Sequence, residues 1–298
     1  MNSKITFAAV LATTLISVAC NTTQKAVDSV TSSVSSGTTS VTSTVSSAAT
    51  SVTSTVSSAA TSAHNTVMGT PKPHWSYGGE GAPDNWGGLE ESYAACKVGT
   101  QQSPIDITKG STVKAALGPI TTSYSGSTGN IINNGHTVQV NVDKGGFITT
   151  PSGTYNLLQF HFHSPSEEKF NGVNYPLVAH LVHKNAAGNL AVVAVLFKLG
   201  AENQALNEIW GSIPGKAGPA VPLKANIDVS KLAGARINSY YTFPGSLTTP
   251  PCSEAVTWYV SKNPVTISQT QLSAFRNIYN GNARPVQPLN GRRIIEVN

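Results

Sequence analysis

The sequence lacks any cluster of basic residues. Its 298 residues include 19 Lys and Arg against 14 Asp and Glu, which gives a formal charge of +5, and the basic side chains are scattered along the chain. Proteins that bind nucleic acid concentrate Lys and Arg on one face or along one helix. We therefore expect no nucleic-acid partner.

The sequence also lacks an apolar run long enough to cross a bilayer at its N-terminal end. Lys4 precedes an apolar run over residues 5–16, and small residues then lead to Cys20. A transmembrane helix needs about 20 apolar residues, so this run is too short to form one. A basic residue, a short apolar run and small residues are the layout of an export signal, which we assign to residues 1–19.

Residues 17–20 resemble a bacterial lipoprotein box, in which Cys20 becomes the lipidated first residue of the mature chain. Ordinary cleavage nearby is the alternative, because Ser17 stands where leucine is usual. Asn21, in place of the aspartate that would favour retention in the inner membrane, points to the outer membrane. We predict an exported protein of the periplasm or cell surface, anchored to the outer membrane through Cys20.

Cysteine is scarce, with three in the whole chain. If Cys20 carries lipid, Cys96 and Cys252 remain. Two thiols in an oxidising compartment most simply form a disulfide, and the alternative is two separate buried thiols. A bridge closing so long a loop would stabilise the fold by up to about 4 to 5 kcal/mol.

Residues 20–70 lack aromatic side chains and almost all charge, and consist mainly of Ser, Thr, Val and Ala. Blocks of eleven residues repeat at 29–39, 40–50 and 51–61. A period of eleven suits a helix in a right-handed supercoil, but Ser, Thr and Val are weak helix formers. We therefore expect a flexible tether, with a helical stalk as the alternative.

Residues 71–298 contain the aromatics, apolar runs and spaced Gly and Pro that the tether lacks, in a length sufficient for one core. Short β-rich segments bounded by turn residues recur, and two segments have helical periodicity, one of them with Ser268 as its N-cap. The prediction is a single, predominantly β domain with a large, mostly antiparallel sheet and a few short helices. The predicted strands are 131–132, 137–142, 157–163, 177–183, 190–198 and 256–260, and the predicted helices are 201–213 and 268–279.

Histidines concentrate in residues 157–183, which hold four of the seven. Alternate residues of a strand share a face, so His161 and His163 lie on one face together with Gln159. On the next predicted strand His180 and His183 point to opposite faces, and we expect His183 to be structural. If the two strands pair, His180 completes a triangle of imidazoles. The other face of the first strand would carry Leu158, Phe160 and Phe162.

A triangle of three neutral imidazoles is typical of a catalytic zinc site, because structural zinc sites are usually closed by four protein ligands. Such a metal lowers the pKa of a bound water towards neutrality. A lone histidine is more often an ordinary core or surface residue, but three at this spacing favour a metal.

Separated motifs occur in order at residues 74–78, 102–107, 133–136, 159–163, 166–167, 180–183, 247–251, 256–258 and 282–289. On these motifs, residues 71–298 resemble the α-class carbonic anhydrases. The resemblance implies a single domain built on a central twisted, mostly antiparallel sheet of about ten strands with a few short helices. It also implies a zinc enzyme that hydrates carbon dioxide reversibly to bicarbonate and a proton, by attack of zinc-bound hydroxide with a histidine proton shuttle.

Position by position, the resemblance assigns three catalytic groups. Thr248 would orient the hydroxide and pass its own proton to Glu167, and His136 would relay protons to buffer. Taken without the family, Thr248 is a turn residue, Glu167 a surface carboxylate like its neighbour Glu168, and His136 an exposed loop histidine. The Zn2+ ligands implied are His161, His163 and His180.

The resemblance also implies a substrate site beside the metal. The Thr248 backbone and Thr249 would contact the substrate or bicarbonate, next to an apolar wall suited to a small uncharged substrate. By composition alone the wall residues are ordinary core positions. The wall is implied to consist of Val182, Val192, Leu247, Val256 and Trp258, and the residues ordering water towards His136 are implied to be Tyr77, Asn134 and Gln139.

The groups that would orient the ligands show one departure from the family. Gln159 can orient His161, and the backbone carbonyl of Asn282 can orient the second ligand. The family usually has a glutamate two residues before the third ligand, and here that residue is Val178. Either another group or water takes this role, or His180 is held loosely.

Two rival functions use the same observations. A noncatalytic binding module could display this fold at the cell surface on the repetitive tether, and a zinc scavenger could use the three histidines for storage. The sequence leaves a homodimer open beside a monomer.

Overall fold

The structure is a computed structural model and describes residues 73–234 and 236–298, all of them in one compact unit. The predicted export signal, Cys20, the tether and the boundary at residue 71 lie outside the described residues. Within these two ranges, no helix has the length and apolar character needed to traverse a membrane.

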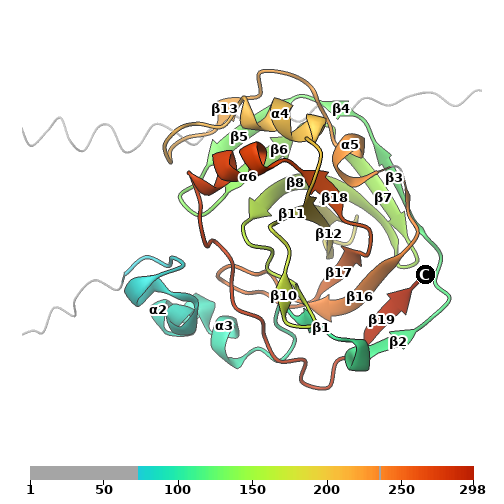
Figure 1. Cartoon of the computed structure of the whole chain (residues 1–298). Coiled ribbons are helices and arrows are strands. Elements are labelled where there is room, and N and C mark those ends of the chain that lie inside the picture. The colour runs from blue at the N-terminus through green and yellow to red at the C-terminus, as the bar shows by residue number, and fades with distance from the viewer. Residues whose placement is uncertain (1–72, 235) are drawn as a thin grey trace, which may run out of the picture. The chain divides into compact units, whose positions relative to one another are not determined.

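One large twisted sheet dominates the described domain (Figure 1). Its fourteen strands are β2 (Thr112–Lys114), β3 (Ile120–Tyr124), β5 (Gly129–Asn133), β6 (Val138–Val142), β7 (Gly146–Thr150), β8 (Gly153–His163), β11 (Leu177–Lys184), β12 (Leu190–Leu199), β13 (Val221–Pro222), β15 (Arg236–Ile237), β16 (Tyr240–Gly245), β17 (Val256–Ser261), β18 (Val265–Ile267) and β19 (Ile294–Val297).

Ten of these strands follow one path, in the order β13, β5, β6, β8, β11, β12, β17, β16, β19, β2. Most neighbours are antiparallel, and the parallel pairs are β12 with β17, β12 with β18, and β19 with β2. The predicted fold class, predominantly β with a mostly antiparallel sheet of about ten strands, is confirmed.

Smaller elements complete the described domain. The short strands β1 (Asp106–Ile107), β9 (Lys169–Phe170) and β10 (Val173–Asn174) form a three-stranded sheet, and β4 (Gly126–Ser127) pairs with β14 (Ile227–Asp228). The helices are α2 (Trp86–Leu89), α3 (Ala95–Val98), α4 (Gln204–Trp210), α5 (Ser230–Ala233) and α6 (Gln269–Arg276), with 3-10 turns at η1 (Gly79–Gly81), η2 (Pro83–Asn85), η3 (Glu91–Tyr93) and η4 (Lys109–Ser111).

Both predicted helices are present but shorter than the periodic segments suggested. Asn203 caps α4 by accepting from the N–H of Ala205, and the helix ends before Gly211. Ser268 caps α6 in a reciprocal capping box with Gln271, as its position predicted. The apolar faces of both helices pack on one side of the sheet, in the cluster that contains Phe160 and Phe162.

The pairing of β8 with β11 is antiparallel and in the register that the histidine pattern requires. His161 lies opposite His180, and His163 lies opposite Val178. The prediction for Leu158 is wrong, because the register shifts by one residue between Val182 and His183. This bulge leaves Leu158 39% exposed and turns the preceding residue, Leu157, into the core in its place.

A disulfide joins Cys96 of α3 to Cys252, as predicted, across a sequence separation of 156 residues. Both cysteines are buried against Trp86 and Leu89. The bridge ties the N-terminal segment that contains α2 and α3 to the loop that follows β16. That loop contains Thr248 and Thr249, and the N–H of Cys252 donates to the carbonyl of Thr249.

Removal of this disulfide should destabilise the fold. We expect the Cys96→Ser/Cys252→Ser variant to lose about 2 to 5 kcal/mol of unfolding free energy, because the unfolded chain gains conformational entropy when the long loop is no longer closed. Urea unfolding followed by tryptophan fluorescence would measure the loss. Reductant should lower the stability of the unmodified protein and leave the double variant unchanged; equal midpoints for the two proteins in oxidising buffer would contradict the expectation.

Candidate functional site

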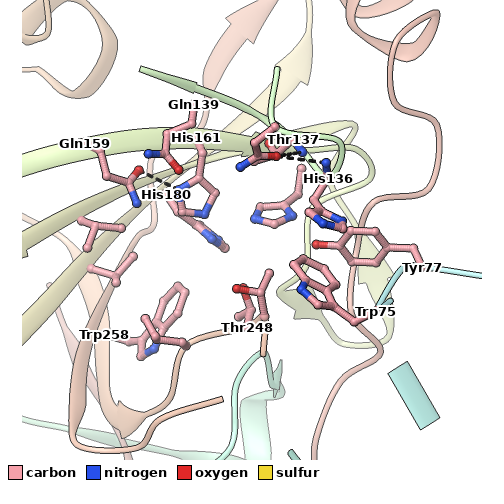
Figure 2. A pocket seen from close by; sticks show the side chains of 16 residues that line it. Trp75, Tyr77, His136, Thr137, Gln139, Gln159, His161, His180, Thr248 and Trp258 are labelled. Carbon is pink, nitrogen blue, oxygen red and sulfur yellow. Dashed lines mark hydrogen bonds between the residues drawn. The ribbon is translucent and has the colours of Figure 1, made fainter. Parts of the chain in front are cut away.

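Three imidazoles converge where β8 pairs with β11. The candidate ligand nitrogens of His161, His163 and His180 all lie within 4.8 Å of one another. The rings of His161 and His180 meet edge to face, with centroids 5.5 Å apart. Figure 2 shows both rings turned into the same cavity, with Thr248 facing them from the other side. The strands thus bring the three predicted ligands together.

Hydrogen bonds fix the orientation of the first two imidazoles. Nδ1 of His161 lies 2.9 Å from Oε1 of Gln159, and Nδ1 of His163 lies 2.7 Å from the carbonyl oxygen of Asn282. Both partners are oxygens that accept, so each Nδ1 carries the proton and each Nε2 keeps a lone pair. Gln159 and Asn282 therefore lie where the sequence placed them. Within the described part of the chain, Nε2 of His163 is buried and has no hydrogen-bond partner.

The third imidazole is oriented by a residue that the sequence analysis did not assign to the site. Nε2 of His180 lies 3.1 Å from Oε1 and 3.4 Å from Oε2 of Glu168, which leaves Nδ1 to face the other two histidines. Glu168 had been considered only as a surface carboxylate, and it is fully buried. The sequence shows Glu168 as a second acid directly after Glu167. The direction of its side chain, however, depends on how the bend that contains it packs against β11.

Burial keeps the first two ligands neutral. It lowers the pKa of His161 to about 3, with the nearby His180 contributing, and it holds the pKa of His163 well below its ordinary value. For His180, burial lowers the pKa, but the charge and hydrogen bond of Glu168 outweigh it, and the net shift is upward. Metal ligands must present a lone pair. Three converging imidazole nitrogens, one of them buried without another partner among the described residues, fit Zn2+ as the ion they would hold.

Glu167 lies beside this cluster and is also buried. Its Oε1 accepts from the N–H of Arg284 at 2.8 Å, and its Oε2 lies 3.5 Å from Nε2 of His163. Burial raises the pKa of Glu167 to about 7, while the charge of His180, the Arg284 N–H and the Thr248 side chain act in the opposite direction. Arg284 lies in the segment 282–289, and its place in the sequence carries no signal of this contact.

The histidines open into a cavity of about 190 Å³. Thr248 and Thr249 line it, together with Val182, Val192, Leu247 and Trp258 of the predicted apolar wall. Val256 does not line the cavity; it is buried in the same apolar cluster as Trp258. In Figure 2, Trp258 lies at one end of the cavity, and His136, Trp75 and Tyr77 gather at the other. The cavity therefore has an apolar end and an aromatic, imidazole-bearing end.

His136 stands at the second end of the cavity and is held by its neighbours. Its ring stacks on Trp75 with centroids 3.6 Å apart, and its Nε2 lies 3.1 Å from Nε2 of the exposed His74. Asn134 accepts from the N–H groups of His136 and Thr137 at 2.9 Å each. Burial, and secondly the charge of His74, lower the pKa of His136.

The other predicted water-ordering residues, Tyr77 and Gln139, also line the cavity. Trp75, His74 and Thr137 also contribute to this end of the cavity, although the sequence assigned them no role in the site. His74 and Trp75 belong to a motif that had been recognised, but only the fold shows that this segment lies against the loop of His136. His183, expected to be structural, is buried and contacts the Tyr124 hydroxyl at 2.8 Å through Nε2.

Comparison with known proteins agrees with this geometry. The sequence profile of the eukaryotic-type carbonic anhydrases matches residues 81–298. A carbonic anhydrase of Klebsiella pneumoniae is 46% identical over 226 residues, which are 75% of this chain and 91% of that protein.

Solved structures with this fold include bacterial enzymes. An alpha-carbonic anhydrase from Thermovibrio ammonificans, in complex with the inhibitor sulfanilamide, is 44% identical, has a TM-score of 0.72, and covers 74% of this chain and 98% of its own. That of Photobacterium profundum is 44% identical with a TM-score of 0.69, over 75% and 100% of the two chains. A profile that spans well over half of the chain and relatives this similar lead to one conclusion: the chain belongs to the eukaryotic-type, or alpha, carbonic anhydrase family of enzymes.

Proposed function

We propose that this enzyme catalyses the zinc-dependent, reversible hydration of carbon dioxide to bicarbonate and a proton, with His161, His163 and His180 holding the metal. The observation that carries the proposal is the set of three buried imidazoles whose ligand nitrogens lie within 4.8 Å of one another. Each outer ring nitrogen is engaged by an oxygen, so the lone pairs converge. A zinc ion, when bound, supplies a Lewis acid that generates a hydroxide nucleophile from water near neutral pH.

Thr248 and Glu167 would set the direction of the attacking lone pair. The Thr248 hydroxyl has one proton to donate. Its influence on the pKa of Glu167 supports donation to that carboxylate, whose Oε1 is already occupied by the Arg284 N–H. A hydroxyl that donates to Glu167 must then accept from the nucleophile, which leaves a lone pair of the nucleophile turned towards the substrate.

The apolar end of the cavity would hold carbon dioxide. Val182, Val192, Leu247 and Trp258 line this wall, and none of these side chains carries a charge. A linear, uncharged molecule needs positioning and no ionic partner, so an apolar wall beside a nucleophile is sufficient. Thr249 lines the same cavity and would contact the bicarbonate product.

His136 would carry the proton out of the site. Each turnover releases one proton, which must reach bulk buffer before the next. Burial, with the charge of His74, lowers the pKa of His136, which favours the neutral imidazole that can accept a proton. Tyr77, Asn134 and Gln139 line the same cavity as His136 and would order the intervening water.

We also propose that the enzyme is exported and held at the outer membrane by lipid on Cys20, with residues 20–70 as a spacer. The support is the sequence layout: a basic residue, a short apolar run and small residues before Cys20, followed by a charge-poor repetitive segment. Its substrate would then be the carbon dioxide or bicarbonate of the cell envelope.

Loss of a ligand should remove both metal and activity. The protein should contain stoichiometric zinc and hydrate carbon dioxide. His161→Ala should reduce zinc affinity and hydration by more than about 100-fold, because a lost ligand costs more than the loss of an outer hydrogen-bond partner. Zinc content by mass spectrometry and stopped-flow hydration would measure these effects. Zinc-free protein, or equal activity in the variant, would favour a noncatalytic binding module.

His136→Ala should separate proton transfer from metal binding. This variant should retain its zinc but lose about 10-fold or more of the hydration rate in dilute buffer, since an imidazole relay is missing. Added imidazole or concentrated buffer should restore the rate. An unchanged rate in dilute buffer would assign the shuttle to another group.

Cys20→Ser should release the protein from membranes. In cells, the unmodified chain should sediment with the membrane fraction and incorporate labelled palmitate, because stable anchoring at this site depends on covalent lipid. The variant should appear in the soluble envelope fraction without label, whereas Cys96→Ser, as a control, should remain labelled. Palmitate incorporation that survives Cys20→Ser would contradict the assignment.

A further inference from the structure

The residue that usually orients the third zinc ligand in this family is replaced by a valine in this chain. Val178 stands two residues before His180, where a carboxylate is usual in this family. It is fully buried in the apolar cluster that also contains Ile105 and Ile107. Its side chain has no group that can accept a hydrogen bond, so it cannot fix the orientation of the His180 imidazole.

A carboxylate nevertheless reaches that imidazole from another element. Both oxygens of Glu168 lie near Nε2 of His180, at 3.1 and 3.4 Å, and both side chains are essentially inaccessible to solvent. An ionised carboxylate can only accept, so His180 must donate from Nε2. Nδ1 is thereby left with its lone pair, on the side where the nitrogens of the other two histidines lie.

The backbone around Glu168 is held firmly enough for this task. The Ser166 hydroxyl donates to the Glu168 carbonyl at 2.7 Å, and the N–H of Ser166 donates to the Tyr175 carbonyl at 2.8 Å. Immediately afterwards, Lys169 enters the three-stranded sheet of β1, β9 and β10. These bonds anchor the segment on both sides of the carboxylate.

The burial of Glu168 also needs a physical explanation, because a buried carboxylate is costly unless it is paired and hydrogen-bonded. Within the described residues, the short polar contact of the Glu168 carboxylate is with Nε2 of His180, at 3.1 Å. The His180 ring also packs nearly perpendicular to the Trp258 indole, with ring centroids 4.8 Å apart. The imidazole thus contacts both a carboxylate and an indole.

We propose that Glu168 is the positioning residue for His180, and that the carboxylate which orients the third zinc ligand has moved in this chain from β11 to the bend before β9. The inference rests on the proposed function, because it concerns how the zinc ligand is held. Outer hydrogen-bond partners of metal ligands typically contribute 10- to 100-fold to metal affinity, and this contribution is the quantity to measure.

The test measures zinc dissociation by transfer to a chromophoric chelator, on the full chain. Glu168→Gln keeps the size of the side chain and removes its charge, and Glu168→Val removes the acceptor. We expect zinc to dissociate about 10-fold faster from the first variant and up to about 100-fold faster from the second. Glu208→Gln makes the same chemical change on α4, away from the cavity, and should leave dissociation unchanged.

The decisive variant exchanges the two side chains. Glu168→Val/Val178→Glu returns the carboxylate to the position usual in the family, and it should recover most of the zinc retention that Glu168→Val loses. A purely structural role of Glu168 predicts no such recovery, because the second change adds another buried charge. Circular dichroism of the metal-free variants reports whether they fold, and Glu168→Gln keeps the test informative if a valine variant does not.

The outcomes distinguish this inference from the proposed function. If the unmodified protein binds no zinc, the proposed function fails. If the unmodified protein binds zinc and the folded Glu168 variants release it at the same rate, the inference fails alone. Faster release that the exchange does not repair, in folded protein, would also overturn it, since Glu168 would then act through packing.

Discussion

The site depends above all on the register between β8 and β11. His161 lies directly opposite His180, and His163 lies two pairs further along, opposite Val178. Because side chains alternate with a period of two, a slip of one residue would send an imidazole to the other side of the sheet. That side is filled by Phe160, Phe162 and the helices α4 and α6, so the slip would also bury polar rings among apolar ones. The apolar packing on the face of Phe160 and Phe162 therefore enforces the arrangement of the histidines on the other face of the sheet.

The outer ring nitrogens of the three histidines and one oxygen of Glu167 each have a hydrogen-bond partner. Gln159, the Asn282 carbonyl and Glu168 each take one outer ring nitrogen, and the Arg284 N–H takes one oxygen of Glu167. A buried polar atom without a partner costs more than a hydrogen bond returns. Within the described residues, the buried side-chain atoms that have no hydrogen-bond partner include Nε2 of His163 and Oε2 of Glu167, which lie 3.5 Å apart beside the converging nitrogens. These two unsatisfied atoms lie at the place where an ion would be held.

Periodicity was sufficient to predict the strands that carry the site, the facing of His161 and His163, and the cap at Ser268. These features depend on residues close in the chain. The bulge that exposes Leu158 was not predictable, because it arises from a pairing between strands. Glu168 could not be assigned for a related reason: its neighbour Glu167 is the same type of residue in the same stretch of sequence. The direction of each carboxylate depends on the hydrogen bonds of Ser166 to the Glu168 carbonyl and to Tyr175.

Glu167 and Glu168 are consecutive residues that serve different partners. One lies beside Thr248 and the other holds His180. In a strand, neighbours would point in opposite directions, and only the bend before β9 lets both face the same cluster. The contacts of Glu167 with Thr248 and of Glu168 with His180 are therefore coupled through one peptide unit. If the carboxylate that orients His180 lay on β11 instead, the two contacts would be on separate elements. A substitution or insertion in the β9–β10 hairpin would disturb ligand retention and nucleophile orientation together, so this hairpin has less freedom to vary than its place outside the main sheet suggests.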